Sequence, residues 1–196
     1  MATDLDFQRN FRKGQQFWAE GETIQMQFHF TPKNAVYTWA SYYSNGKINS
    51  TQTATAKSPS TLPQTISYRN KSLIRFKHIS VGGKHYFKGD AMQESGWSIY
   101  GQGGFGVILG RVINSYATHV DTSLYVTSLS EGKANFKRLT IDLGIGWEKS
   151  LGGTLYLYSD LRFWVPTSDY PSTYLSVNHD APLAGMLNFG VRILFD

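Results

Sequence analysis

The stretch that decides the fold is residues 139–147, LTIDLGIGW, in which large apolar side chains alternate with small or polar ones. The chain closes on a similar stretch, residues 187–195, LNFGVRILF. Successive side chains along a β-strand point to opposite faces, so each stretch is expected to form a strand with one apolar face. Nothing of comparable length repeats with the period of a helix.

The same alternation recurs along the chain and predicts eight strands and no helix of useful length. The expected strands are 17–30, 35–44, 47–57, 68–87, 95–112, 136–148, 153–166 and 184–195. The pair Asn45-Gly46 separates the second from the third, because both residues accept the positive φ angles of a type I′ hairpin turn. The whole chain, 1–196, is expected to be one domain, with 1–16 as an N-terminal periplasmic lead-in to the first strand.

Composition narrows the class of protein. Of 196 residues 41% are hydrophobic and 15% aromatic, and only 17% are charged. No apolar run approaches the roughly 18 residues of a membrane-spanning helix, which leaves a soluble β protein or a β-barrel in lipid. The absence of Cys excludes disulfides, thiolate nucleophiles and Cys-zinc sites. The net charge of +5 is scattered rather than gathered in one stripe, so no nucleic-acid partner is expected.

The polar faces of the strands decide whether water or lipid surrounds the barrel. A soluble lipocalin-like barrel should carry mainly Lys and Glu there, but these faces carry Gly, Thr, Gln and Tyr. They also carry single charges of both signs, which we expect to form a polar network inside a narrow lumen: Arg138, Asp142, Glu148, Asp160, Arg162 and Arg192. The apolar faces are therefore expected to meet lipid, and the predicted fold is an all-β, eight-stranded, antiparallel, up-and-down transmembrane β-barrel.

Connection lengths give an independent indication of the same class. Outer-membrane barrels have short turns on the periplasmic side and long loops on the outside. The expected periplasmic turns are short, at Ser44–Lys47, Lys88–Ser95 and Lys149–Gly153. The expected outer connections are Thr31–Asn34, a loop around Pro59, 113–135 and 167–183. Three of these four are long, and Thr31–Asn34 is the exception.

The chain resembles the outer-membrane β-barrel domain common in Bacteroidota, a small OmpA/OmpX-like barrel. The matching residues are Phe11-Arg-Lys-Gly14, 39–47 (WASYYSNGK), 79–87 (ISVGGKHYF), 141–147 (IDLGIGW) and 187–195. The resemblance implies a bacterial outer-membrane location and a cleaved signal peptide, which is absent here. It also implies contact with outer-membrane lipid or lipopolysaccharide, and a C-terminal strand that the assembly machinery recognises. Asp196 after Phe195 departs from the usual aromatic end.

Several side chains are candidates for chemistry or binding. His78 and Ser80 share a strand face with the His-x-Ser spacing of an outer-membrane lipid A deacylase, in which His would activate Ser as nucleophile. Ordinary polar strand residues are the favoured interpretation, and no catalytic residue, metal site or cofactor is predicted. Loops 113–135 and 167–183 carry the binding candidates, because exposed loops on a rigid scaffold commonly bind partners. These candidates are Tyr116, His119, Tyr125, Tyr170 and Tyr174.

The predicted role is non-enzymatic: a structural, adhesive or complex-forming barrel of the outer membrane, with other outer-membrane proteins as possible partners. Two alternatives stay open at this point. One is an outer-membrane lipid-modifying enzyme of the lipid A deacylase kind, acting through His78 and Ser80. The other is a soluble lipocalin-like carrier of an apolar ligand.

Overall fold

The computed structural model describes residues 1–11, 16–167 and 183–195, which form nine β-strands and no helix. The strands are β1 (Ala2–Asn10), β2 (Phe17–Thr31), β3 (Asn34–Ala56), β4 (Thr65–Lys88), β5 (Trp97–Tyr116), β6 (Tyr125–Thr127), β7 (Gly132–Gly152), β8 (Leu155–Pro166) and β9 (Ala184–Ile193). The described residues thus contain no helix that could cross a membrane.

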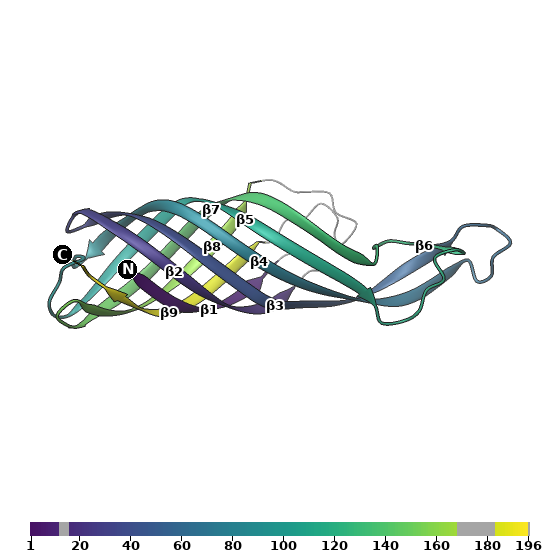
Figure 1. Ribbon diagram of the computed structural model, residues 1–196, viewed down its shortest axis with the longest axis horizontal. Coiled ribbons are helices and arrows are strands. Elements are labelled where there is room, and N and C mark those ends of the chain that lie inside the picture. Colours follow the sequence, from purple (N-terminus) through teal and green to yellow (C-terminus); the bar gives the residue numbers. More distant parts are fainter. Residues whose placement is uncertain (12–15, 168–182, 196) are drawn as a thin grey trace.

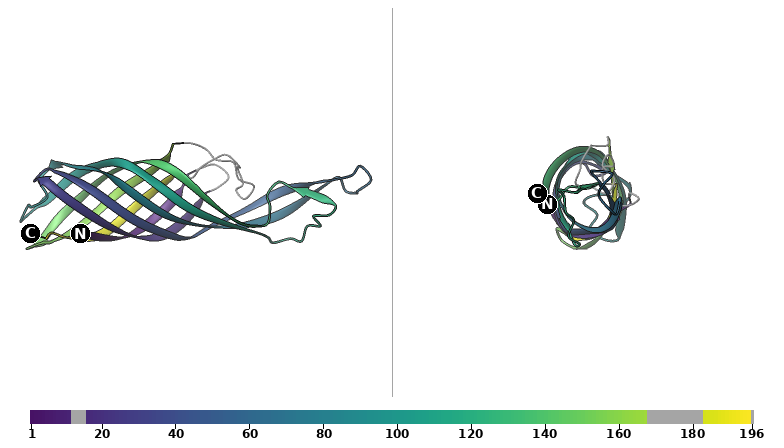
Figure 2. Two further views of the ribbon diagram at one scale, coloured as in Figure 1. Left: turned by 45° about the horizontal axis from the view of Figure 1, so that its top comes forward. Right: turned by 90° about the vertical axis from the view of Figure 1, so that its right-hand side faces the viewer.

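Eight of the strands close into a ring. Each pairs antiparallel with the next along the chain, with β5 pairing directly with β7, and β9 returns to pair with β1. The end-on view in Figure 2 shows the closed wall. The remaining strand, β6, lies outside the ring and pairs only with the C-terminal end of β3. The predicted eight-stranded up-and-down antiparallel barrel is confirmed.

The prediction that residues 1–16 only lead into the barrel is wrong, because β1 is a full member of the ring. It pairs along its whole length with both β2 and β9. Its inward side chains include Asp4 and Asp6, whereas Leu5 and Phe7 point outward. Two outward apolar residues among polar neighbours make a weak hydrophobic pattern, and for that reason the strand was not expected.

The hairpin predicted at Asn45-Gly46 is also wrong, because β3 runs unbroken through it. Tyr43 pairs with Phe76 and Gly46 pairs with Ile74, so two residues of β3 lie opposite Arg75 alone. This is a β-bulge, and Asn45 takes a φ of 62° in it. The expected strands 35–44 and 47–57 are therefore one strand. This merger offsets the missed β1, and the ring still counts eight.

We expect substitutions at Asn45 to measure the strain of this bulge. The left-handed backbone costs about 1–2 kcal/mol for an ordinary L-residue and nothing extra for Gly. Asn45→Val should therefore unfold at lower urea concentration in detergent micelles, whereas Asn45→Gly should match the parent. Equal midpoints for the two variants would show that the bulge relaxes without that conformation.

The two ends of the barrel differ in their connections. Both termini lie at one end, here the termini end, with the short connections between β2 and β3, β4 and β5, and β7 and β8 (Figure 1). The opposite end, the loop end, carries the connections 57–64 and 117–131. Because β1 starts at the termini end, β2 starts at the loop end and runs opposite to the expected direction. Thr31–Asn34 therefore lies at the termini end and not among the outer loops. Ser44–Lys47 is no turn at all.

The sorting of side chains between the two faces follows the predicted alternation. Leu143, Ile145 and Phe189 stand on the outer wall with about half of their surface exposed, at 50%, 54% and 49%. Asp142 and Asn188, which alternate with them, are buried inside, as is Gln102 on β5. The molecule therefore presents apolar side chains to its surroundings and encloses polar ones, the reverse of a soluble barrel.

Candidate functional site

The centre of the lumen is built around one buried arginine. Arg162, on β8, lies 3.0 Å from a carboxylate oxygen of Asp4 through Nη2 and 2.9 Å from Asp160 through Nε. Its guanidinium also lies 4.6 Å from the ring centre of Trp39 on the opposite wall. Asp4 comes from β1, so this cluster joins β1 to β8. All four side chains are buried.

A second buried cluster lies nearer the termini end. Glu148 of β7 is 2.8 Å from Arg192 and 3.3 Å from the Lys84 ammonium, and it accepts a hydrogen bond from the Tyr86 hydroxyl. The Lys84 ammonium also lies 3.5 Å from the ring centre of Tyr100. The two clusters together place cations against carboxylates throughout this half of the lumen. Such pairing is what buried charges require, because an unpaired ion in a dry interior is costly.

Toward the loop end the lumen becomes apolar. Phe17, Phe76 and Trp164 belong to a buried cluster that also contains Ala19, Tyr43, Ile48, Ile74, Ile108, Val112, Ala184 and Met186. Side chains thus fill the interior, as expected for a barrel of eight strands. A lipocalin-like carrier needs an open apolar cavity, and the buried charges occupy the place where that cavity would be.

Five of the six residues expected to line the lumen are buried there: Asp142, Glu148, Asp160, Arg162 and Arg192. Arg138 is half-buried nearer the loop end and donates a hydrogen bond to the Lys137 carbonyl. The sequence reasoning missed Asp4 and Lys84, the partners from other walls. Only their place in the strand alternation could have indicated that they face the lumen, since each lies between two outward-facing neighbours.

His78 and Ser80 both face the lumen but are not arranged as a catalytic pair. The His78 Nδ1 atom accepts a hydrogen bond from the Trp39 indole, and its Nε2 lies 3.2 Å from the Thr140 hydroxyl and 3.3 Å from Asp142. The Ser80 hydroxyl donates to the Phe105 carbonyl instead. Both side chains are buried inside the wall. A lipid outside the barrel could not reach this serine without opening the wall, so the geometry gives the deacylase-like alternative no support.

The described residues contain no cluster of side chains suited to a metal ion. Across 1–11, 16–167 and 183–195, no three His, Asp or Glu side chains gather as a set that could hold an ion.

Four strands continue past the ring at the loop end. β2 pairs with β3 only as far as Ser44, and β8 pairs with β7 only from Thr140 onward. Beyond these limits β3, β4, β5 and β7 remain paired with one another as an open sheet, with β6 on the edge of β3 (Figures 1 and 2). We call this part, residues 45–75 and 111–139, the arm.

The arm has a small hydrophobic core of its own. Tyr68 packs edge to face on Tyr116 at 5.0 Å between ring centres, and Val120 and Tyr125 complete the cluster with Ala54. The Tyr116 hydroxyl donates to the Leu129 carbonyl at 2.6 Å, and the Tyr125 hydroxyl donates to Pro63 at 3.0 Å. These contacts fold loop 117–131 back onto the sheet.

The predicted loop-binding residues therefore divide into three groups. Tyr116 and Tyr125 pack inside the arm, where they hold the loop in place. His119 is exposed. Tyr170 and Tyr174 lie outside the described residues. Near His119, the hydroxyl and the backbone amide of Ser123 both donate to Asp121, and these bonds hold the pKa of that exposed carboxyl below its usual value.

The arm is strongly basic. Residues 45–75 contain five Lys or Arg and 111–139 contain four, against Asp121 and Glu131 as the acidic residues. No Asp or Glu occurs between Glu22 and Asp90. Within the described residues, the ion pairs given above all lie inside the lumen, and none of them involves Arg69, Lys71, Arg75 or Arg111.

Comparison with known proteins identifies the architecture. No protein-family model matches the chain, and no curated protein matches its sequence. Among solved structures, the Neisserial surface protein A (NspA) aligns with a TM-score of 0.57 and 12% identity, over 99% of this chain and 95% of that one. Ail, the attachment invasion locus protein of Yersinia pestis, aligns with a TM-score of 0.53 and 13% identity, over 99% and 95% of the two chains.

The fold is that of small outer-membrane β-barrels. A second structure of Ail, in complex with the heparin analogue sucrose octasulfate, aligns with a TM-score of 0.52 and 10% identity over 99% and 96% of the two chains. Identities this low relate the chains by fold, and what this chain does has to be argued from its own residues.

Proposed function

We propose that this chain is an outer-membrane β-barrel protein with its apolar wall in lipid and its arm outside the cell. Three features of the molecule support this placement: the outward apolar residues, the ion pairs enclosed in the lumen, and the short connections confined to the termini end. The location of the termini end on the periplasmic side belongs to the same proposal. We also propose that the chain belongs to the Bacteroidota barrel domain, that the assembly machinery recognises β9, and that the barrel contacts other outer-membrane proteins.

The role we propose is adhesive and non-enzymatic, and the arm is the observation that carries it. About ten residues per strand suffice to cross a membrane, yet β3, β4, β5 and β7 each have 20 residues or more. The extra length forms a sheet with its own core, far more structure than connecting two strands requires. A basic, ordered projection of this kind suits attachment to an anionic polymer outside the cell.

The Ail complex supports the same class of ligand by analogy, since sucrose octasulfate is a small sulfated carbohydrate. On this chain, Arg69 and Lys71 are exposed on the part of β4 that belongs to the arm, and Lys57 is exposed at the start of the connection to β4. We propose that these cations bind sulfate or carboxylate groups of an extracellular polysaccharide. Such binding should weaken with added salt, because exposed charges are screened.

Binding to immobilised heparin tests this role. We expect the double variant Arg69→Ala/Lys71→Ala to bind about tenfold more weakly than the parent, corresponding to about 1.4 kcal/mol. The matched control is Lys33→Ala/Lys149→Ala, which removes two exposed cations at the termini end and should bind like the parent. Equal weakening by both double variants would mean that net charge alone, and not the arm, determines heparin binding. Unchanged binding by the arm variant would contradict the proposal.

A further inference from the structure

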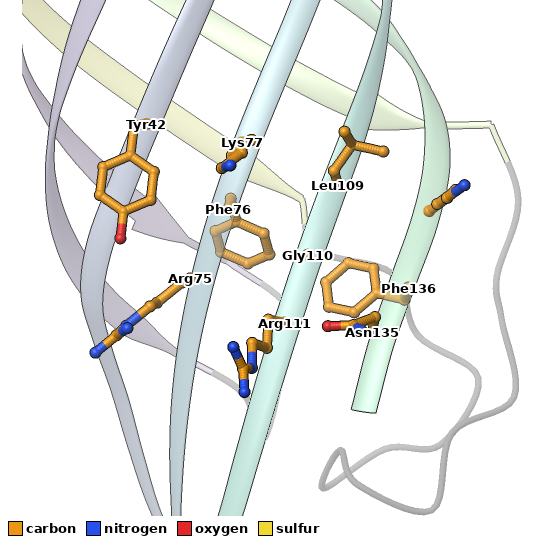
Figure 3. Close-up of a pocket in the computed structure, with 10 residues that line it drawn as sticks. Tyr42, Arg75, Phe76, Lys77, Leu109, Gly110, Arg111, Asn135 and Phe136 are labelled. Carbon is orange, nitrogen blue, oxygen red and sulfur yellow. The ribbon is translucent and has the colours of Figure 1, made fainter. Parts of the chain in front are cut away.

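A groove opens on the outer wall at the base of the arm, where β3, β4, β5 and β7 leave the ring. It encloses about 710 Å³ and is lined by Tyr42, Arg75, Phe76, Lys77, Leu109, Gly110, Arg111, Asn135, Phe136 and Lys137. Figure 3 shows the charged side chains on neighbouring strands around it. Four of its ten lining residues are Lys or Arg, and none is acidic.

The register of the strands forces these cations together. Arg75 of β4 pairs directly with Arg111 of β5, and both side chains are exposed on the outer face. One step closer to the termini end, Lys77 pairs with Leu109, which in turn pairs with Lys137 of β7. Like charges directly opposite each other on a sheet repel and destabilise it. Among the described residues no carboxylate forms an ion pair with Arg75 or Arg111. An anion from outside the chain would neutralise this repulsion.

The height of the groove on the wall indicates which anion. The next outward row toward the termini end is apolar, with Ile79, Val107 and Leu139 paired side by side across β4, β5 and β7. The cations therefore begin one row above the apolar wall. In a membrane this is the level of lipid headgroups, where Lys and Arg meet phosphate while apolar neighbours meet acyl chains.

We propose that this groove binds the phosphorylated headgroup of a glycolipid in the outer leaflet. The guanidinium groups of Arg75 and Arg111 hold the phosphate, because planar Arg forks bind phosphate oxygens in pairs. Lys77 and Lys137 add charge from the lipid side, and Leu109 contacts the apolar part of the same molecule. The site goes beyond the adhesive role, although it rests on the membrane placement proposed above.

A soluble polysaccharide is the less suitable occupant of this groove. A flexible polymer in water has no reason to prefer cations that border an apolar wall, and Arg69 and Lys71 offer it exposed charge farther from the membrane. A lipid headgroup is confined to the level of the groove by its own acyl chains. The bound lipid would brace the base of the arm against the membrane surface.

The test compares lipid A bound to parent and variant protein. The protein is inserted into phosphatidylcholine nanodiscs containing a small fraction of diphosphorylated lipid A, and lipid that stays bound is quantified by native mass spectrometry. We expect Arg75→Gln/Arg111→Gln to weaken retention at least tenfold. The control Lys47→Gln/Lys133→Gln removes the same charge from exposed positions of the arm above the groove and should retain lipid A like the parent.

Three other results would overturn the site. The first is equal retention of lipid A by the parent and the groove variant. The second is that the parent retains dephosphorylated lipid A as well as the diphosphorylated form. The third is that the groove variant loses binding of sucrose octasulfate but still retains lipid A. The last would make the groove a polysaccharide site. Failure of the parent to insert into nanodiscs would instead refute the membrane placement, and the heat-dependent migration of a folded barrel on unboiled gels distinguishes that case.

Discussion

Replacing Arg162 with Ala is expected to lower the free energy of unfolding by about 3–5 kcal/mol, the cost of breaking a buried ion pair by removing one partner. The variant leaves the carboxylates of Asp4 and Asp160 buried without the cation that lies within 3.0 Å of both. It also removes the guanidinium from the face of Trp39. Urea unfolding in detergent micelles, followed by tryptophan fluorescence, measures the loss.

A triple variant separates the charge from the packing. In Arg162→Met/Asp4→Asn/Asp160→Asn none of the three substituted positions carries a buried charge and the side-chain volumes are nearly kept, so we expect most of the lost stability to return. Lys133→Ala, which removes an exposed cation from the arm, should stay within about 0.5 kcal/mol of the parent. A small effect of Arg162→Ala would mean that water enters the lumen and solvates the two carboxylates.

The alternation of side chains made the wall of the barrel predictable. Residues 139–147 and 187–195 carry large apolar side chains at every second position, and both were placed with the correct face outward. The charged lumen followed from the same alternation, since Asp142, Asp160 and Arg162 occupy the intervening positions. Period-two patterns depend only on local backbone geometry, so they can be recognised without knowledge of the partner strands.

The pairing within the lumen could not be predicted in the same way. Asp4 and Arg162 are separated by 158 residues and meet only because β1 closes the ring against β9. Because β1 was not predicted, one of the two carboxylates that pair with Arg162 was missed as well. Local signals misled at Asn45-Gly46, where the same positive φ that favours a hairpin serves a bulge in a continuous strand.

The arm was hidden for a related reason. Its strands alternate like those of the wall, but most of their outward residues are polar or basic, as in Lys47, Lys71 and Arg111. A sequence with that pattern reads equally as a loop or a weak strand. What defines the arm is the point where β2 and β8 stop pairing, which depends on the lengths of neighbouring strands and not on the residues of the arm itself.

Replacing Leu143 with Arg is the second large effect that we expect. Leu143 stands outward in the middle of the apolar run of β7 and is 50% exposed, so it makes few contacts inside the protein. In water, such a substitution at an exposed position should change stability by no more than about 0.5 kcal/mol. In a bilayer, Arg at the midplane of a barrel wall costs about 2–4 kcal/mol.

The matched control is Ile113→Arg, at an outward position of β5 within the arm. If the arm lies outside the bilayer, this change should cost about 0–1 kcal/mol, the range found near and beyond the interface. Both variants are measured by reversible urea unfolding in phosphatidylcholine vesicles, and again in detergent micelles. Equal costs at the two positions in vesicles would mean that Leu143 and Ile113 share one environment, and the apolar wall would then not be the surface that lipid covers.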